Sequence, residues 1–428
     1  MQKSRDRTVD ISYNEKSRNG HKSIFSYNSR MAKYDGTPCA VKVACTVWVG
    51  GKSRDYFKAL PINITIVCGS PGSGKTFALL NFAANSLGMG QRVIAIDPKN
   101  DFNKLYNVNP NIEIIDINDI RPGALNPFEF LKKVEKDGTV KNIDSPTLMT
   151  IIELLTGKLD QDTKIAITPI VQDFIKKSNM THQYYDMQDV ADYLFANKRK
   201  EAQAVGTVLK MYEDSKFGKL LFTRETNIKP LVLSETSSMV ISLHGMNLPD
   251  YSKAVDDYDA NERFTTAILY IICNKLYDIL AAGSKIPTVL ICDEAHLLFC
   301  NKEMKALIDK FLVVGRSLNV ATILASQGIS HFPNDISNYI TTKFLFKSSI
   351  DEATAFITRF DTSKLGGAAT AIDTKSIIGL VTNFSTGQCF MLDQFNRNGI
   401  IKIKSIYDTK LLTSNPFEKT EIKHDDEV

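Results

Sequence analysis

The chain has 428 residues, of which 43% are hydrophobic and 23% are charged, and its formal net charge at pH 7 is +4. This composition excludes a fibrous or wholly disordered protein. The length allows one large α/β domain with an insertion, or two domains. The sequence shows no apolar run of about 18 residues and no signal-peptide pattern, so we expect a cytoplasmic protein without a transmembrane segment of its own.

Positive charge gathers at the N-terminus. Residues 1–60 carry 12 Lys and Arg against 5 Asp and Glu, whereas the remainder carries 40 against 43. A basic segment attracts nucleic acid or an anionic membrane surface, but solvated basic tails are equally common. We therefore interpret residues 1–58, with one strand candidate at 40–49, as a basic N-terminal extension whose role stays open.

From residue 62 the hydrophobic pattern predicts strands that alternate with helices, which is typical of a parallel sheet. The first predicted elements are a strand at 62–68, a helix at 75–87 and strands at 92–97 and 112–117. Helical periodicity then dominates in runs at 147–155, 165–177, 186–196 and 201–213. The α/β pattern resumes with strands at 239–243, 288–293 and 320–326, helices at 262–282 and 302–314, and later strands at 342–347, 388–392 and 400–405.

These elements predict an α/β protein with a RecA-like P-loop NTPase sheet, helices on both faces and an inserted all-α domain. We expect residues 59–127 and 231–412 to form the ATPase domain around the insertion at 128–230. Residues 413–428 are interpreted as a polar C-terminal tail.

The segment 69–76 fits the P-loop pattern, follows an apolar strand and opens a helix, as that motif requires. Its residues are Gly69, Ser70, Pro71, Gly72, Ser73, Gly74, Lys75 and Thr76. The glycines let backbone N–H groups surround the phosphates of ATP, and the helix N-terminus adds positive potential. Lys75 can reach the β and γ phosphates, and the Thr76 hydroxyl can ligate Mg²⁺.

An acidic pair, Asp293 and Glu294, ends the apolar strand at 288–293. A P-loop needs such a partner at the end of a neighbouring strand. Asp293 is expected to hold Mg²⁺, and Glu294 to act as the general base or to polarise the attacking water. The next strand ends in Ser326 and Gln327, and we expect Gln327 to sense the γ-phosphate or to orient water.

His296 completes an Asp-Glu-Ala-His sequence that invites comparison with helicases of that name. The spacing from Lys75 to Asp293 and the Ser-Gln ending of the next strand argue against that comparison. We interpret His296 as a packing residue at the start of a helix.

Taken together, these motifs resemble the conjugative-transfer ATPases of type IV secretion systems, which are related to the FtsK/HerA motors. The likeness covers roughly residues 62–405. Besides the P-loop and the acidic pair, it includes the segments 97–101, 125–128, 212–222, 315–316, 326–327 and 387–399.

The resemblance implies an ATP- and Mg²⁺-dependent motor that assembles as a homo-oligomer, typically a hexamer. It also implies partners from a secretion or conjugation machine at the cytoplasmic face of the cell membrane, with DNA as a further candidate partner. Arg316 and Arg397 occupy the positions of the family's arginine motifs, where an arginine of one subunit reaches the ATP of its neighbour.

The chain departs from the family pattern in two places. Only about 60 residues precede the P-loop, so the chain is either a short member or a fragment. Asp97-Pro-Lys-Asn-Asp101 replaces the usual Pro-Lys-Gly-Glu, so Lys99 and Asp101 either line the nucleotide pocket or form a polar turn.

The sequence therefore predicts an ATPase that energises substrate transfer or pilus assembly in a conjugative DNA-transfer machine. Two alternatives stay open: an FtsK/HerA-type DNA translocase not tied to secretion, and an ATP-gated scaffold with little turnover.

Overall fold

The fold is taken from a computed structural model of the chain. It describes residues 64–134, 140–181, 183–223, 229–250, 253–282, 286–315, 317–360, 374–393 and 398–404. The predicted N-terminal extension with its strand at 40–49 and the predicted tail at 413–428 lie outside the described residues.

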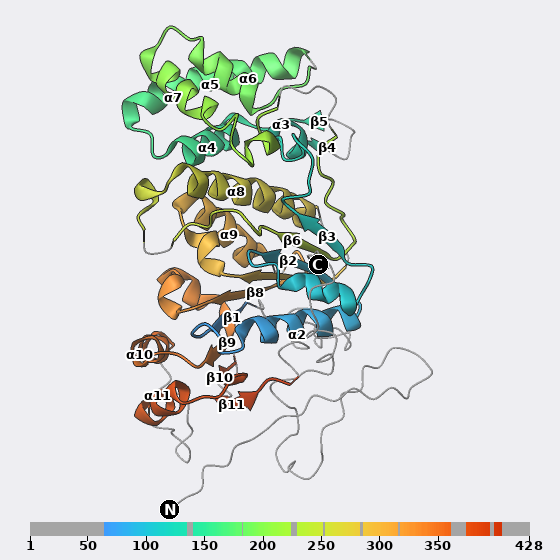
Figure 1. The fold of residues 1–428 in the computed structure, drawn as a ribbon, viewed down its shortest axis with the longest axis vertical. Coiled ribbons are helices and arrows are strands. Elements are labelled where there is room, and N and C mark those ends of the chain that lie inside the picture. The colour runs from blue at the N-terminus through green and yellow to red at the C-terminus, as the bar shows by residue number, and fades with distance from the viewer. Residues whose placement is uncertain are drawn as a thin grey trace, which may run out of the picture.

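Within the described residues, nine strands form one sheet in the order β11-β10-β9-β1-β8-β7-β2-β6-β3 (Figure 1). The strands are β1 (Ile64–Cys68), β2 (Arg92–Asp97), β3 (Glu113–Asp116), β6 (Met239–Ser242), β7 (Thr288–Asp293), β8 (Val320–Ser326), β9 (Ile340–Phe346), β10 (Gln388–Leu392) and β11 (Asn398–Lys402). Each of these strands was predicted, and each predicted range overlaps the observed one.

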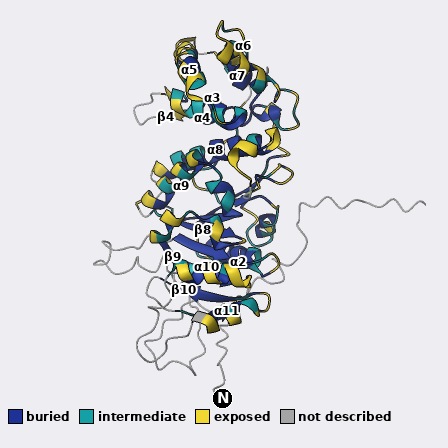
Figure 2. Cartoon of the chain, turned by 90° about the vertical axis from the view of Figure 1, so that its left-hand side faces the viewer, coloured by how far each residue is buried: buried dark blue, intermediate teal, exposed yellow. Residues whose placement is uncertain are grey.

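The sheet is buried on both faces, as its near-continuous apolar strands require. Side chains alternate along each strand. In β1, Ile64, Ile66 and Cys68 therefore join one core cluster and Val67 joins the other. The second cluster contains α2 (Lys75–Gly88) and η3 (Phe102–Asn107). The first contains α8 (Ala260–Ala281), α9 (Lys302–Val314), α10 (Ile350–Arg359) and α11 (Thr374–Thr382). Helices thus cover both faces, and Figure 2 shows the buried strands between them.

Two features of the sheet differ from the prediction. β10 pairs antiparallel with both β9 and β11, so the sheet is mixed rather than parallel. The chain reaches β10 after two short helices, α10 and α11, that the sequence reading missed. In addition, β8 lies between β1 and β7, so the acidic strand is not hydrogen-bonded to the P-loop strand. Strand order depends on tertiary packing, which local periodicity does not record.

The predicted insertion lies at one end of the molecule in Figure 1. Its helices are α3 (Pro127–Phe130), α4 (Ser145–Thr156), α5 (Gln161–Thr181), α6 (Met187–Phe195) and α7 (Lys200–Lys210). A two-residue antiparallel ladder, β4 (Lys133–Val134) with β5 (Val140–Lys141), interrupts the all-α pattern. The division of the chain at residues 128 and 230 stays a prediction.

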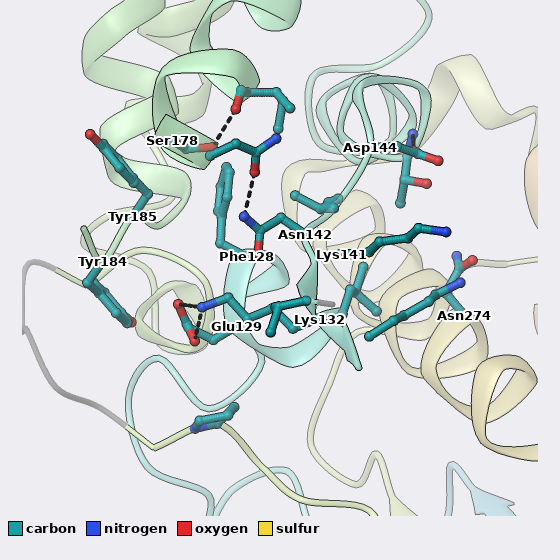
Figure 3. Close-up of a pocket in the computed structure, with 18 of the residues that line it drawn as sticks. Phe128, Glu129, Lys132, Lys141, Asn142, Asp144, Ser178, Tyr184, Tyr185 and Asn274 are labelled. Carbon is teal, nitrogen blue, oxygen red and sulfur yellow. Dashed lines mark hydrogen bonds and ion pairs between the residues drawn. The ribbon is translucent and has the colours of Figure 1, made fainter. Parts of the chain in front are cut away.

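A cavity of about 1350 Å³ lies where the insertion meets α8. Figure 3 shows the Lys132–Glu129 ion pair and the bond from Asn142 to Asn179 on its wall, with Asn274 contributed by α8. The lining includes no residue of the P-loop or of β7. The cavity is therefore separate from the site described below.

Among the described helices, α8 alone is long and apolar enough by length and composition to cross a membrane. Lys275 and Asp278 interrupt its apolar sequence, so a search for unbroken apolar runs misses it. However, 72% of its most apolar window is buried inside the protein, and α8 packs against α4 and α9. This burial is that of a core helix.

Candidate nucleotide-binding site

The P-loop connects β1 to α2 as predicted, and its lysine lies folded over the loop. The Lys75 Nζ donates to the carbonyl oxygens of Gly69 at 2.6 Å and Ser70 at 3.0 Å. Gly74, the last residue before α2, has φ of 104°, a conformation that glycine adopts without strain. Burial lowers the pKa of Lys75, although the nearby carboxylate of Asp293 opposes this effect. An anionic ligand in the loop can replace the two carbonyls as the partner of this ammonium group.

The acidic strand meets the P-loop through Asp293. The Thr76 hydroxyl donates to Asp293 Oδ2 at 2.8 Å, across 217 positions of sequence. Asp293 is only 1% exposed, and burial raises its pKa even though the bond from Thr76 lowers it. These are hard oxygen ligands of the kind that Mg²⁺ prefers. No group of three or more His, Cys, Asp or Glu suited to a metal occurs among the described residues. Because Mg²⁺ is usually bound by one or two protein ligands together with phosphates and water, the Thr76 hydroxyl and the Asp293 carboxylate fit this ion.

Glu294 has a strained backbone and a crowded carboxylate. Its φ of 73° and ψ of 54° place it in the left-handed region, which costs on the order of 1 kcal/mol or more for a residue with a side chain. One carboxylate oxygen contacts the Lys99 ammonium group, and the other lies 3.4 Å from His296 Nδ1. Burial opposes its ionisation, but the adjacent His296 ring and Lys99 ammonium group outweigh burial and lower the pKa of Glu294 to about 2. The carboxylate is therefore ionised at neutral pH.

The turn after β2 supplies Lys99 and resolves the alternative left open by the sequence. The buried Asp97 organises this turn by accepting from the backbone N–H groups of Lys99 at 3.1 Å and Phe102 at 2.8 Å. Lys99 reaches Glu294, whereas Asp101 lies 3.5 Å from Lys104. Burial disfavours the charge on Lys99, but the bond to Glu294 raises its pKa. Lys99 thus lines the site, and Asp101 belongs to the turn.

His296 is the second residue of η6 (Ala295–Phe299), as expected of a residue near a helix start. The sequence reading missed its position beside Glu294. Its ring also packs edge-on against His331, with ring centroids 5.6 Å apart. His331 Nδ1 lies 2.6 Å from the hydroxyl of Ser326, at the end of β8. The short spacing from Glu294 to His296 was the available signal for this contact.

The other predicted site residues are less fully defined. Gln327 is exposed and directly follows β8, between the P-loop strand and the acidic strand. Its role as a γ-phosphate sensor stays a prediction. Arg316 and Arg397 lie outside the described residues, so their roles as arginine fingers also stay predictions.

A P-loop between β1 and α2, an acidic strand two places away and helices on both faces define a RecA-like P-loop NTPase. Residues 61–414 match the family model described as an AAA-like domain. The chain belongs to this family.

Among solved structures, one has a related fold and two others are less similar. The chain is similar to VirB4 of Thermoanaerobacter pseudethanolicus, with a TM-score of 0.61 and 17% identity over 81% of this chain and 91% of that one. Similarity to the bacterial conjugative coupling protein TrwB has a TM-score of 0.45, with 13% identity over 82% of this chain and 86% of that one. Similarity to B204, the DNA-packaging ATPase of Sulfolobus turreted icosahedral virus, has a TM-score of 0.35, with 12% identity over 81% and 98%. The search of curated proteins finds no significant match.

Proposed function

We propose that this chain is an ATPase that energises a conjugative DNA-transfer or type IV secretion machine. The observation that carries the ATPase assignment is the bond between Thr76 of the P-loop and Asp293 of the acidic strand, with Glu294 beside it. It brings together, from distant parts of the sequence, the residues that we propose to bind phosphate, to ligate the metal and to act as the base.

The residues that follow β1 and those at the end of β7 have different proposed roles in ATP hydrolysis. Lys75 would exchange its loop carbonyls for the β and γ phosphates, while Thr76 and Asp293 would hold the metal. When bound, Mg²⁺ neutralises charge that develops on the phosphate oxygens. Glu294, ionised at neutral pH, orients the attacking water and accepts its proton as the bond from the γ-phosphorus to the ADP oxygen breaks. Gln327 is proposed to orient the same water.

The transfer role is supported by the motif order and by the fold likeness to VirB4. We propose a homo-oligomer, a hexamer by resemblance, in which Arg316 or Arg397 of one subunit reaches the ATP of its neighbour. Its proposed location is the cytoplasm or the cytoplasmic face of the membrane, beside other components of the machine. An FtsK/HerA-type translocase and a scaffold with little turnover are the rival functions.

Steady-state ATPase measurements on Lys75→Ala and Glu294→Gln, with and without DNA, test this proposal. We expect both variants to lose activity by roughly 10²- to 10⁴-fold. Lys302→Ala and Glu303→Gln, on the first turn of α9, are matched controls that should retain wild-type activity.

Stimulation by DNA without any envelope component would favour the translocase, and its absence would favour a secretion-assembly ATPase that awaits its membrane partners. Slow turnover that Glu294→Gln leaves unchanged would favour the scaffold. Equal activity in wild type and both site variants would contradict the assigned site.

A further inference from the structure

The antiparallel ribbon β10–β11 brings a turn against the P-loop. Because β10 runs antiparallel to β9, the amino end of β10 lies at the sheet edge where the parallel strands have their carboxyl ends. The turn at residues 385–388, which enters β10, therefore lies beside the loop that leaves β1. We call it the 385–388 turn.

The 385–388 turn contacts the outer side of the P-loop through its backbone. The Gly387 N–H donates to the Ser73 carbonyl at 2.9 Å, and the Thr386 hydroxyl lies 3.5 Å from the Gly72 carbonyl. A Cβ atom on Gly74 would lie only 2.9 Å from Gly387 N and 3.1 Å from Gly387 Cα. The two segments pack so closely that no side chain fits between them.

The turn is itself held in place. The Gln388 side-chain oxygen accepts from the backbone N–H of Ser385 at 2.9 Å and from its hydroxyl at 2.8 Å. The Gly387 carbonyl accepts from Ile403 N–H at 2.9 Å, just beyond β11. Gly387 has φ of 82°, in the left-handed region that favours glycine. The turn is thus a fixed part of the ribbon.

These contacts orient the peptide groups of the P-loop. In a planar trans peptide the C=O and N–H point in opposite directions. The Ser73 carbonyl points out toward Gly387, so the Gly74 N–H points toward the interior of the loop. On the other side, Ser70 N–H donates outward to Lys347 O at 2.7 Å, and the Gly69 carbonyl points inward to Lys75. The loop is held from both sides.

We propose that the 385–388 turn is a clamp that keeps the P-loop in its phosphate-binding conformation, with Gly387 and Thr386 as positioning residues. The inference rests on the proposed ATPase function. The clamp acts on the phosphate end of the ligand, because its contacts are to P-loop carbonyls. The binding of any ligand with a polyphosphate group should therefore depend on the clamp to the same extent.

Binding of a fluorescent ATP analogue to the full chain with Mg²⁺, and its competition by inorganic tripolyphosphate, test the clamp. We expect Gly387→Ala to weaken both ligands by about 10-fold, because a Cβ at positive φ displaces the turn. Thr386→Val should weaken both by about 2- to 3-fold, and Thr386→Ser should restore binding. In ATPase assays, Gly387→Ala should raise KM more than it lowers kcat.

Gly90→Ala is the matched control. Gly90 has φ of 73°, but an added Cβ would meet no atom within 4 Å and no contact joins it to the 385–388 turn. A loss equal to that of Gly387→Ala would overturn the clamp, as would unchanged affinity in Gly387→Ala. Weaker ATP binding with unchanged tripolyphosphate binding would also overturn it, because the turn would then contact the nucleoside.

Hydrogen exchange without nucleotide separates the clamp from the proposed function. Residues 69–76 should exchange faster in Gly387→Ala than in Gly90→Ala, and equal rates would overturn the clamp. If exchange is faster in Gly387→Ala but the wild-type protein does not bind ATP, the result would support the clamp and contradict only the ATPase proposal.

Discussion

The interactions that stabilise the P-loop edge of the sheet differ from those that stabilise the helical insertion. At the edge, main-chain hydrogen bonds and close glycine contacts fix the loop, as between Gly387 and Ser73. In the insertion, the stabilising interactions are apolar packing and the hydrogen bonds of one buried carboxylate. Substitutions in the insertion should therefore change stability, whereas substitutions at the edge should change activity.

An aromatic cluster and a buried helix-capping carboxylate stabilise the insertion. The ring of Phe174 packs against Phe128, Tyr185 and Tyr193, with centroids 5.2–5.8 Å apart. Asp186 is 1% exposed and caps α6. It accepts from backbone N–H groups of Gln188 at 2.7 Å, Asp189 at 3.2 Å and Thr223 at 2.9 Å. The start of α6 is thereby tied to the segment through which the chain leaves the insertion.

The largest expected effect on stability is that of Phe174→Ala. Loss of this buried ring should cost about 3–5 kcal/mol, measured by urea unfolding, while nucleotide binding persists in the folded fraction. Phe195→Ala is the control, because Phe195 is 47% exposed and should therefore lose less on truncation than Phe174, including a cation–π contact with Lys210 worth about 1 kcal/mol or less. If folded Phe174→Ala failed to bind ATP, the two regions would not be separable.

Asp186 should make the insertion less stable as pH rises. Burial, followed by repulsion from Asp189, raises the pKa of Asp186 to about 7 despite three backbone donors. The folded state thus keeps a proton that the unfolded chain releases near its ordinary pKa, so stability falls between about pH 4 and pH 7. At about 1.4 kcal/mol per unit of pKa difference, the loss reaches roughly 2–4 kcal/mol.

Thermal unfolding at pH 5 and pH 8 measures this effect. Asp186→Asn keeps a good helix cap but cannot ionise, so the drop in Tm should be smaller than in wild type. Some drop should remain, because burial also raises the pKa of Asp97, to about 6. An identical drop in both proteins would show that Asp186 does not titrate in this range.

The smallest expected effect is a decrease in kcat for a substitution at the P-loop edge of the sheet. Lys99→Met removes the cation that positions Glu294 and should lower kcat by about 10- to 100-fold, because misplacement of a catalytic group is costly. Nucleotide affinity should change little. Lys99→Arg should recover part of kcat, and Lys104→Met, in the neighbouring helix η3, is the control. Normal kcat in Lys99→Met would show that the contact with Glu294 has no role in turnover.

Much of the candidate nucleotide site could be recognised from sequence because each part has a local signature. The Gly-rich segment before Lys75 and the carboxylates after an apolar strand both follow from short-range chemistry. Lys99 and Gly387 were harder to assign, because their contacts with Glu294 and Ser73 join residues 195 and 314 positions apart. Local patterns do not encode pairings over such distances.

The sequence by itself determined the strands of the sheet, most of the helices, the P-loop and the acidic pair, since hydrophobic periodicity and turn chemistry act over a few residues. Tertiary structure alone decided that β8 lies between β1 and β7 and that β10 reverses direction. It also set the left-handed backbone of Glu294. Strand order and direction follow from the packing of the whole sheet, and the surrounding structure must stabilise a strained residue that no local preference would choose.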